Sequence, residues 1–138
     1  MNNLNLSSVG TQHPQLIYFR ATGGHLELNQ VEVVNVASGT GASAIQVDMS
    51  GSAANLTLSH VIFRTCSVNN GTLQVSMTDG NVTLDQVTWR GNAASNMAGA
   101  LALYASNANV MVSNSVFIQN AGTNNGGAVA IEAVGSAS

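Results

Sequence analysis

The chain has 138 residues, of which only 7% are charged, and its three Lys/Arg against six Asp/Glu leave a net charge of −3. Three cations provide no basic footprint for nucleic acid, and the single cysteine, Cys66, permits no internal disulfide. No apolar run reaches the roughly 18 residues of a membrane helix, so we expect no membrane insertion by this segment. The N-terminal MNNLNLSSVG lacks the basic and apolar segments of a signal peptide.

Short stretches of alternating apolar and polar residues recur along the chain. One pattern begins as LNLSSV at Leu4 and is complete as LELNQVEV at Leu26, LTLSHVIF at Leu56, VTLDQVTW at Val82 and VMVSNSVF at Val110. Strict alternation over a few residues indicates strands, and Asn, Ser, Thr and Gly are poor helix formers. These five residues mark the starts of five predicted coils.

A further alternating stretch repeats more strictly. LIYFR, SAIQV, TLQVSM, GALALY and GAVAIE align on Ile17, Ile45, Leu73, Leu101 and Val129, at intervals of 28 residues. Each unit therefore contains three predicted strands, and the first unit is predicted to be shortened around residues 10–14.

Three strands that return in register every 28 residues describe one turn of a parallel β-helix, in which each strand pairs with its equivalents in neighbouring coils. Crossovers between parallel strands are overwhelmingly right-handed. We predict an all-β, right-handed, single-stranded parallel β-helix (a β-solenoid) of about five coils, forming one domain over residues 1–138. A six-residue period is absent, which argues against a left-handed hexapeptide helix, whereas a leucine-rich repeat stays an alternative.

Stacked coils turn equivalent positions into files that run along the solenoid. One file contains Val33, Phe63, Trp89 and Phe117, and the alternation places it in the core. Aromatic stacking there adds about 0.5–1.5 kcal/mol per pair beyond area burial. We therefore expect these rings to be structural and not an exposed binding platform.

Asparagines follow the aromatic file at a fixed distance. Asn92 and Asn120 occupy one file at the turn after the second strand, and their amides can bond backbone groups and each other across coils. Cys66 occupies the same file one coil earlier, where a small buried residue is expected. The sequence therefore predicts a short Asn ladder.

Glycines precede the third strand of the later units, where the backbone must turn sharply into the stack. They are Gly99, Gly126 and Gly127, with Gly71 one coil earlier. Glycine permits positive φ or a close approach of two backbones. We predict that these residues have a structural role.

The spacing of Phe, Asn and glycines forms a recognisable paired motif, Phe-x-x-Asn followed by Gly-Gly-Ala-(Ile/Leu/Val). FIQN…GGAV from Phe117 is a full match, WRGN…AGAL from Trp89 is close, and FRTC…GTL from Phe63 keeps the Phe and one Gly. This motif resembles the repeat of the polymorphic outer-membrane proteins of chlamydiae. The resemblance implies a right-handed β-helix passenger on the outer cell surface or outside the cell. It also implies a non-enzymatic adhesive function, with a protein or carbohydrate of a host or neighbouring cell as partner.

The chain stops in GSAS directly after a predicted strand. Repeat domains usually carry polar capping units, so we expect an internal segment of a longer repeat protein. Loops over residues 37–43, 67–70, 93–98 and 121–125 are predicted to align along one edge of the stack. We expect this edge to contact a partner.

The acidic residues are few and scattered, whereas glycoside hydrolysis requires two carboxyl groups roughly 5–9.5 Å apart. We expect no pair to converge among Glu27, Glu32, Asp48, Asp79, Asp85 and Glu132. The three histidines and one cysteine suggest no zinc set, so we expect neither catalytic residues nor a metal or cofactor. The alternative is the scaffold part of a β-helical polysaccharide lyase or glycoside hydrolase whose catalytic coils lie outside this segment.

Two further sets of residues allow more than one interpretation. Arg64 and Arg90 occupy successive coils, and they either face an anionic partner or pack their stems along the wall. Four asparagines fit the acceptor pattern Asn-x-Ser/Thr and would carry glycans in a secreted eukaryotic protein. These are Asn5, Asn55, Asn70 and Asn81.

Overall fold

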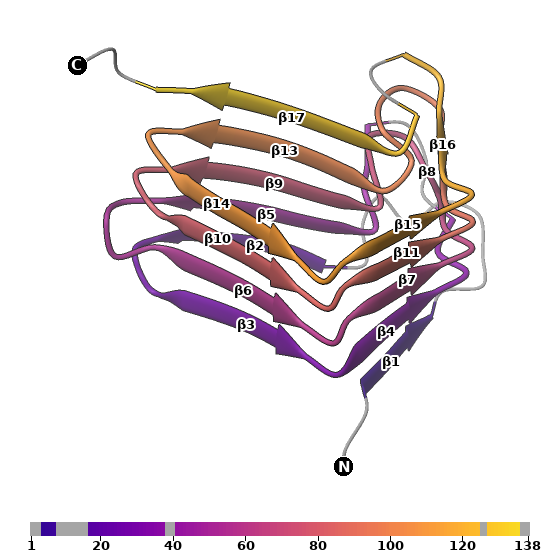
Figure 1. The fold of residues 1–138 in the computed structure, drawn as a ribbon, viewed down its shortest axis with the longest axis horizontal. Coiled ribbons are helices and arrows are strands. Elements are labelled where there is room, and N and C mark those ends of the chain that lie inside the picture. Colours follow the sequence, from indigo (N-terminus) through magenta and orange to yellow (C-terminus); the bar gives the residue numbers. More distant parts are fainter. Residues whose placement is uncertain (1–3, 8–16, 38–40, 125–126, 136–138) are drawn as a thin grey trace.

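A computed structural model describes residues 4–7, 17–37, 41–124 and 127–135. These residues form an all-β, right-handed parallel solenoid of about four turns, with a period of about 28 residues (Figure 1). The predicted fold is confirmed. The shortening expected around residues 10–14 lies outside the described residues.

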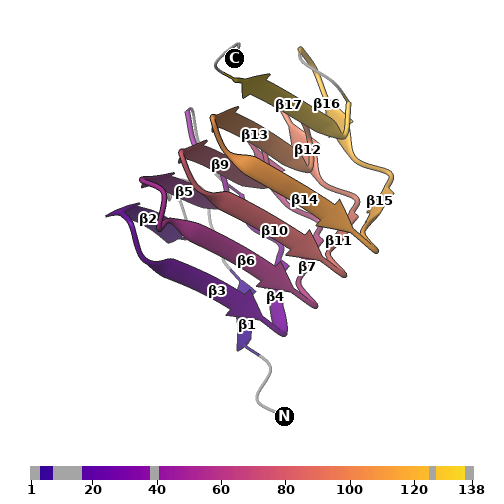
Figure 2. The same ribbon diagram turned by 60° about the vertical axis from the view of Figure 1, so that its left-hand side comes forward.

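The strands stack into three broad walls and one narrow edge, and every pairing is parallel. The β4 wall contains β1 (Leu4–Ser7), β4 (Val31–Val34), β7 (Ile62–Arg64), β11 (Thr88–Arg90) and β15 (Val116–Ile118). The β6 wall contains β3 (His25–Asn29), β6 (Asn55–Ser59), β10 (Asn81–Asp85) and β14 (Asn109–Ser113). The β9 wall contains β2 (Ile17–Thr22), β5 (Ile45–Ser50), β9 (Leu73–Thr78), β13 (Leu101–Ser106) and β17 (Val129–Val134). Figure 2 shows the β6 and β9 walls as parallel stacks of arrows.

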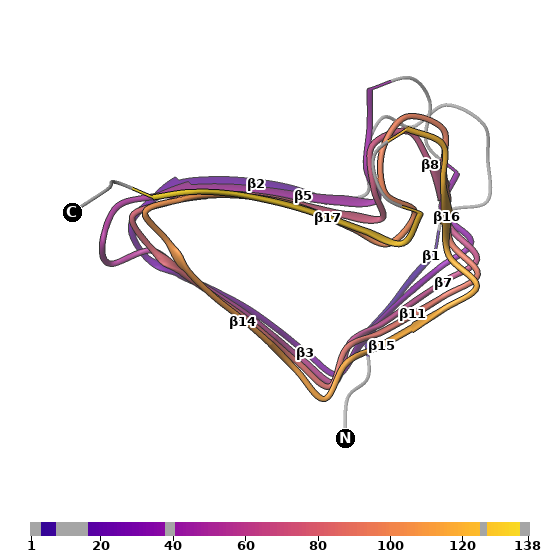
Figure 3. The ribbon, with the colours of Figure 1, turned by 45° about the horizontal axis from the view of Figure 1, so that its top comes forward.

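The narrow β12 edge is a fourth strand position in each coil, where the sequence predicted three. It contains β8 (Ser67–Val68), β12 (Ala93–Ala94) and β16 (Ala121–Gly122). Two residues are too few to show an alternation, so this element carries no readable period in the sequence. Beyond it, the chain arches outward before it enters the β9 wall (Figure 3).

The predicted interval of 28 residues holds along the β9 wall, where Ile17, Ile45, Leu73, Leu101 and Val129 are register partners. Other walls depart from it in two coils. The connection over residues 51–54 is two residues longer than the equivalent Asp79–Gly80, and the connection over residues 69–72 is two residues shorter than the equivalent 95–100. Because one coil contains both changes, the register on the β9 wall is preserved.

The core consists of the predicted inward files. Val33, Phe63 and Trp89 have no exposed surface, and Phe117 packs above them. The rings are nearly parallel, with centroids 5.7 Å apart for Phe63 and Trp89 and 4.5 Å apart for Trp89 and Phe117. The expected aromatic stack is therefore present in the interior.

The corners between walls are made by residues in the left-handed region of backbone space. Gln30, His60, Gln86 and Asn114 form one such corner, with φ between 49° and 55°. Non-glycine residues rarely adopt this conformation, and Asn and His are among those that tolerate it better. Stacking therefore fixes a sharp corner at the same place in successive coils, as Figure 3 shows between β3 and β4.

The glycines expected to be structural differ from one another. A Cβ at Gly99 would lie 2.3 Å from the carbonyl oxygen of Ala121, and Gly71 has a φ of 145°. The requirement for glycine is thus confirmed at both positions. At Gly127 a Cβ would meet no atom within 4 Å, so the close approach seen at Gly99 is not needed there. Gly126 lies outside the described residues.

Candidate interaction surfaces

The predicted Asn ladder connects the aromatic file to the next coil. Asn92, only 1% exposed, donates from Nδ2 to the Phe63 carbonyl at 3.1 Å and to Oδ1 of Asn120 at 2.9 Å. Its own Oδ1 accepts the backbone N–H of Cys66 at 3.0 Å. Asn120 repeats the arrangement by donating to the Trp89 carbonyl at 3.0 Å.

These bonds provide a physical reason for the Phe-x-x-Asn spacing. Each amide reaches back to the carbonyl of the ring-bearing residue one coil earlier and thereby satisfies a buried backbone acceptor. Cys66 lies in the same file and is buried, as predicted. Burial raises the pKa of its thiol, because the thiolate would be desolvated.

Two more Asn ladders lie on the outside, and the sequence analysis missed both. In one, Asn109 donates to Asn81 at 3.1 Å and Asn81 donates to Asn55 at 2.9 Å, at the start of the β6 wall strands. The signal was visible, because an Asn precedes the apolar alternation in three successive coils.

The other outer ladder runs along the loops next to the β12 edge. Asn124 donates to Asn96 at 3.2 Å, and Asn96 donates to Asn70 at 3.1 Å. Side-chain amides thus connect the described part of the edge that we expected to contact a partner. Residues 38–40 and 125 of that edge lie outside the described residues.

The possible glycan acceptors fall within these ladders. The amide nitrogens of Asn55, Asn70 and Asn81 each donate a hydrogen bond, and Thr72, the acceptor pattern's third residue for Asn70, is fully buried. A glycan at Asn81 would occupy the nitrogen that bonds Asn55. Glycosylation stays a prediction for these residues and for Asn5.

The outward file of the β9 wall contains Arg20, Asp48, Ser76, Tyr104 and Glu132 in successive register, as predicted for its last four members. Asp48 accepts a hydrogen bond from the Tyr18 hydroxyl at 2.8 Å, and this bond is the main reason that the pKa of Tyr18 is raised. Two residues, Ser76 and Tyr104, separate the two acids of this file. Their carboxylates therefore do not form a pair of the kind that hydrolysis uses.

The remaining acids each have local partners. Asp85 accepts bonds from Asn114 and Ser113, both at 2.8 Å, and these hold the pKa of its carboxyl below the usual range. Glu27 lies 3.7 Å from His25 on the β6 wall. Among the described residues, no group of three or more His, Cys, Asp or Glu is placed to hold a metal ion.

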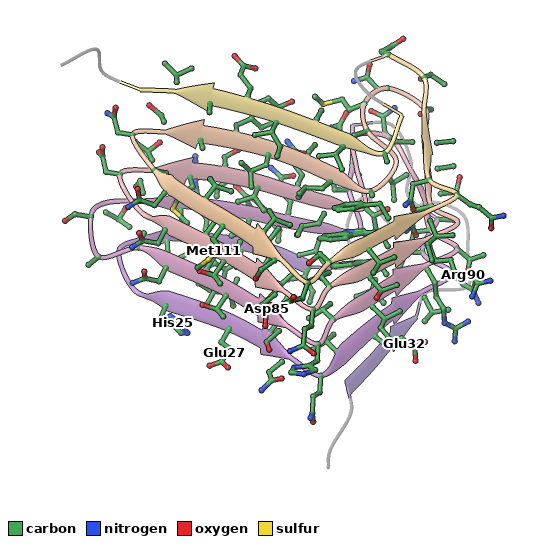
Figure 4. The ribbon with its side chains drawn as sticks, viewed as in Figure 1. His25, Glu27, Glu32, Asp85, Arg90 and Met111 are labelled. Carbon is green, nitrogen blue, oxygen red and sulfur yellow. The ribbon has the colours of Figure 1, made fainter. Side chains whose placement is uncertain are left out.

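The outer surface of the β4 wall has a different composition. Arg64 and Arg90 are register partners, and the Arg64 guanidinium lies 2.5 Å from a carboxylate oxygen of Glu32. Exposed aliphatic residues accompany them, with Ile62 41% exposed and Ile118 38% exposed. Figure 4 shows Glu32 and Arg90 pointing outward from this wall.

No family model, curated protein or solved structure matches the chain in comparisons with known proteins. In the described parts of the chain, no helix has the length and hydropathy needed to cross a lipid bilayer.

Proposed function

We propose that this chain is a non-enzymatic β-helix module that acts as a stiff adhesive element on the outer cell surface or outside the cell. The observation that carries the proposal is the continuity of the stack. Parallel strand pairing runs through the walls from coil to coil, and aromatic and amide files reinforce it inside and outside. Backbone ladders and stacked side chains make a rod that resists bending.

The surface chemistry supports the same proposal. Uncharged polar side chains, mainly Asn, Ser and Thr, dominate the outer face of the β6 wall, and charged residues make up 7% of the chain. Such a surface stays hydrated while presenting hydrogen-bonding groups to a partner. The paired Phe-x-x-Asn and Gly-Gly-Ala motif supports adhesion by its resemblance to the chlamydial repeats.

Beads coated with the whole chain test this proposal against a panel of epithelial and microbial cells. Wild-type beads should adhere above the background of beads coated with the Trp89→Asp variant, whose buried charge should unfold the stack. No adhesion of wild-type beads to any cell type would contradict the proposal. Release of reducing or unsaturated sugars from polysaccharides by the purified chain would instead support the enzyme scaffold.

A further inference from the structure

One surface of the solenoid combines cations with exposed aliphatic side chains. We define the Arg–Ile face as the outward residues Ile62, Arg64, Thr88, Arg90, Val116 and Ile118 of β7, β11 and β15. Ile62, Val116 and Ile118 are 41%, 45% and 38% exposed. The face also contains two of the three Lys/Arg of the chain.

The two arginines stand directly beside each other. Arg64 and Arg90 are register partners in adjacent strands, which lie about 4.8 Å apart. Like charges opposite each other destabilise a strand pair. Glu32 offsets the charge of Arg64 at 2.5 Å, but no described residue forms an ion pair with Arg90.

Folding does not account for this arrangement. The interior of the same wall is fully packed by Phe63 and Trp89, whereas its exterior exposes apolar surface and an unbalanced charge. Departures from local folding rules tend to mark functional positions. Arginine is also enriched at protein–protein interfaces, where lysine and acidic residues are depleted.

We propose that the Arg–Ile face binds an acidic segment of a partner protein, with a carboxylate and an apolar side chain two residues apart. Arginine binds carboxylates in a bidentate geometry. Thr88 and Arg90 are two residues apart on one strand, about 6.6 Å, which matches the spacing of same-side residues in an extended peptide.

A protein fits this face better than an acidic polysaccharide. Both would provide carboxylates for Arg90, but only a protein segment also brings aliphatic groups to cover Ile62, Val116 and Ile118. This inference rests on the proposed adhesive function and identifies its binding surface and the chemistry of its partner.

The test uses the whole chain and a fluorescent peptide of three Glu-Ser-Val-Ser repeats, followed by fluorescence anisotropy. Arg90→Gln should weaken binding about tenfold, in the range of an interfacial arginine. Arg20→Gln, the same charge change on the β9 wall, should leave it within about twofold. Glu32→Gln should strengthen binding about two- to fivefold, because it releases Arg64 from its ion pair.

Several results would overturn the proposal. They are no binding of the acidic peptide by wild type, equal losses in the two Arg→Gln variants, equal binding of a Gln-Ser-Val-Ser peptide, and stronger binding of polygalacturonate than of the peptide. The last result would assign the face to an acidic carbohydrate. Near-ultraviolet circular dichroism, which reports the Trp89 environment, checks that each variant is folded.

The bead assay separates this inference from the proposed function. If wild-type and Arg90→Gln beads adhere equally well, adhesion stands and the Arg–Ile face is not its surface. If wild-type beads fail to adhere, the adhesive function fails whatever the peptide does.

Discussion

The inner and outer Asn ladders use the same bond in different surroundings. Asn92 bonds Asn120 at 2.9 Å inside the stack, and Asn81 bonds Asn55 at the same distance on the β6 wall. Asn92 is 1% exposed, whereas the outer amides are accessible to water. A buried polar group that loses its partner bears the full desolvation penalty, and an exposed one is rehydrated. Bond geometry alone therefore does not measure what a ladder contributes to stability.

The largest effect is expected at the buried end of the inner ladder. Asn92→Ala leaves the Phe63 carbonyl and the Cys66 N–H buried without their partners. At about 1–3 kcal/mol per orphaned group, we expect a loss of about 3 kcal/mol in the free energy of unfolding, measured by urea denaturation. A loss below about 1 kcal/mol would show that water enters this corner and that the ladder is not dry.

Asn120 tests the same ladder where it is partly open. Asn120→Ala frees the Trp89 carbonyl and the Asn92 N–H, but Asn120 itself is half-buried. We expect a loss of about 1–2 kcal/mol under the same urea denaturation. An effect equal to that of Asn92→Ala would mean that exposure does not set the weight of these bonds.

The outer ladder should respond weakly. Asn81→Ala removes bonds to Asn55 and Asn109, whose amides can then bond water. We expect a loss of at most about 1 kcal/mol, with thermal unfolding followed by circular dichroism at 218 nm (the β-sheet minimum) as the measurement. A change as large as that at Asn92 would reverse the comparison.

The smallest effect concerns acid stability on the same outer wall. The pKa of Asp85 is lowered in the folded state, chiefly by the bonds from Asn114 and Ser113, so its contribution is present above the unfolded-state pKa of about 3.9. That contribution is lost as pH falls through the lowered folded-state pKa. Asp85→Asn should therefore flatten slightly the dependence of the urea midpoint on pH between about 2 and 4. An unchanged profile would show that this exposed carboxylate adds nothing measurable.

Much of the fold could be predicted from the sequence because the repeat is written into strands with a period of two. The β9 wall partners Ile45, Leu73, Leu101 and Val129 and the ring file of Phe63, Trp89 and Phe117 follow from counting alone. The Asn92–Asn120 ladder follows from the same stacking. Identical positions in identical coils must meet, so side-chain contacts between coils are readable.

Other features depend on contacts that a repeat does not encode. The β12 edge is two residues wide, and the close approach of Gly99 to Ala121 depends on how the loop arches. The outer ladders were readable as files, but Asn55 and Asn81 were interpreted as glycan acceptors. The Glu32–Arg64 pair is diagonal between strands and depends on side-chain conformation, which the sequence does not determine.

The paired change in loop length has a consequence for how such a solenoid can diverge. A coil is a closed perimeter, and the two residues gained over 51–54 are returned over 69–72 before the β9 wall is reached again. Length can therefore migrate from one corner to another without displacing any wall. Selection, or a protein engineer, is free to enlarge a corner of one coil into a binding loop while its neighbours keep their sequence and their stacking.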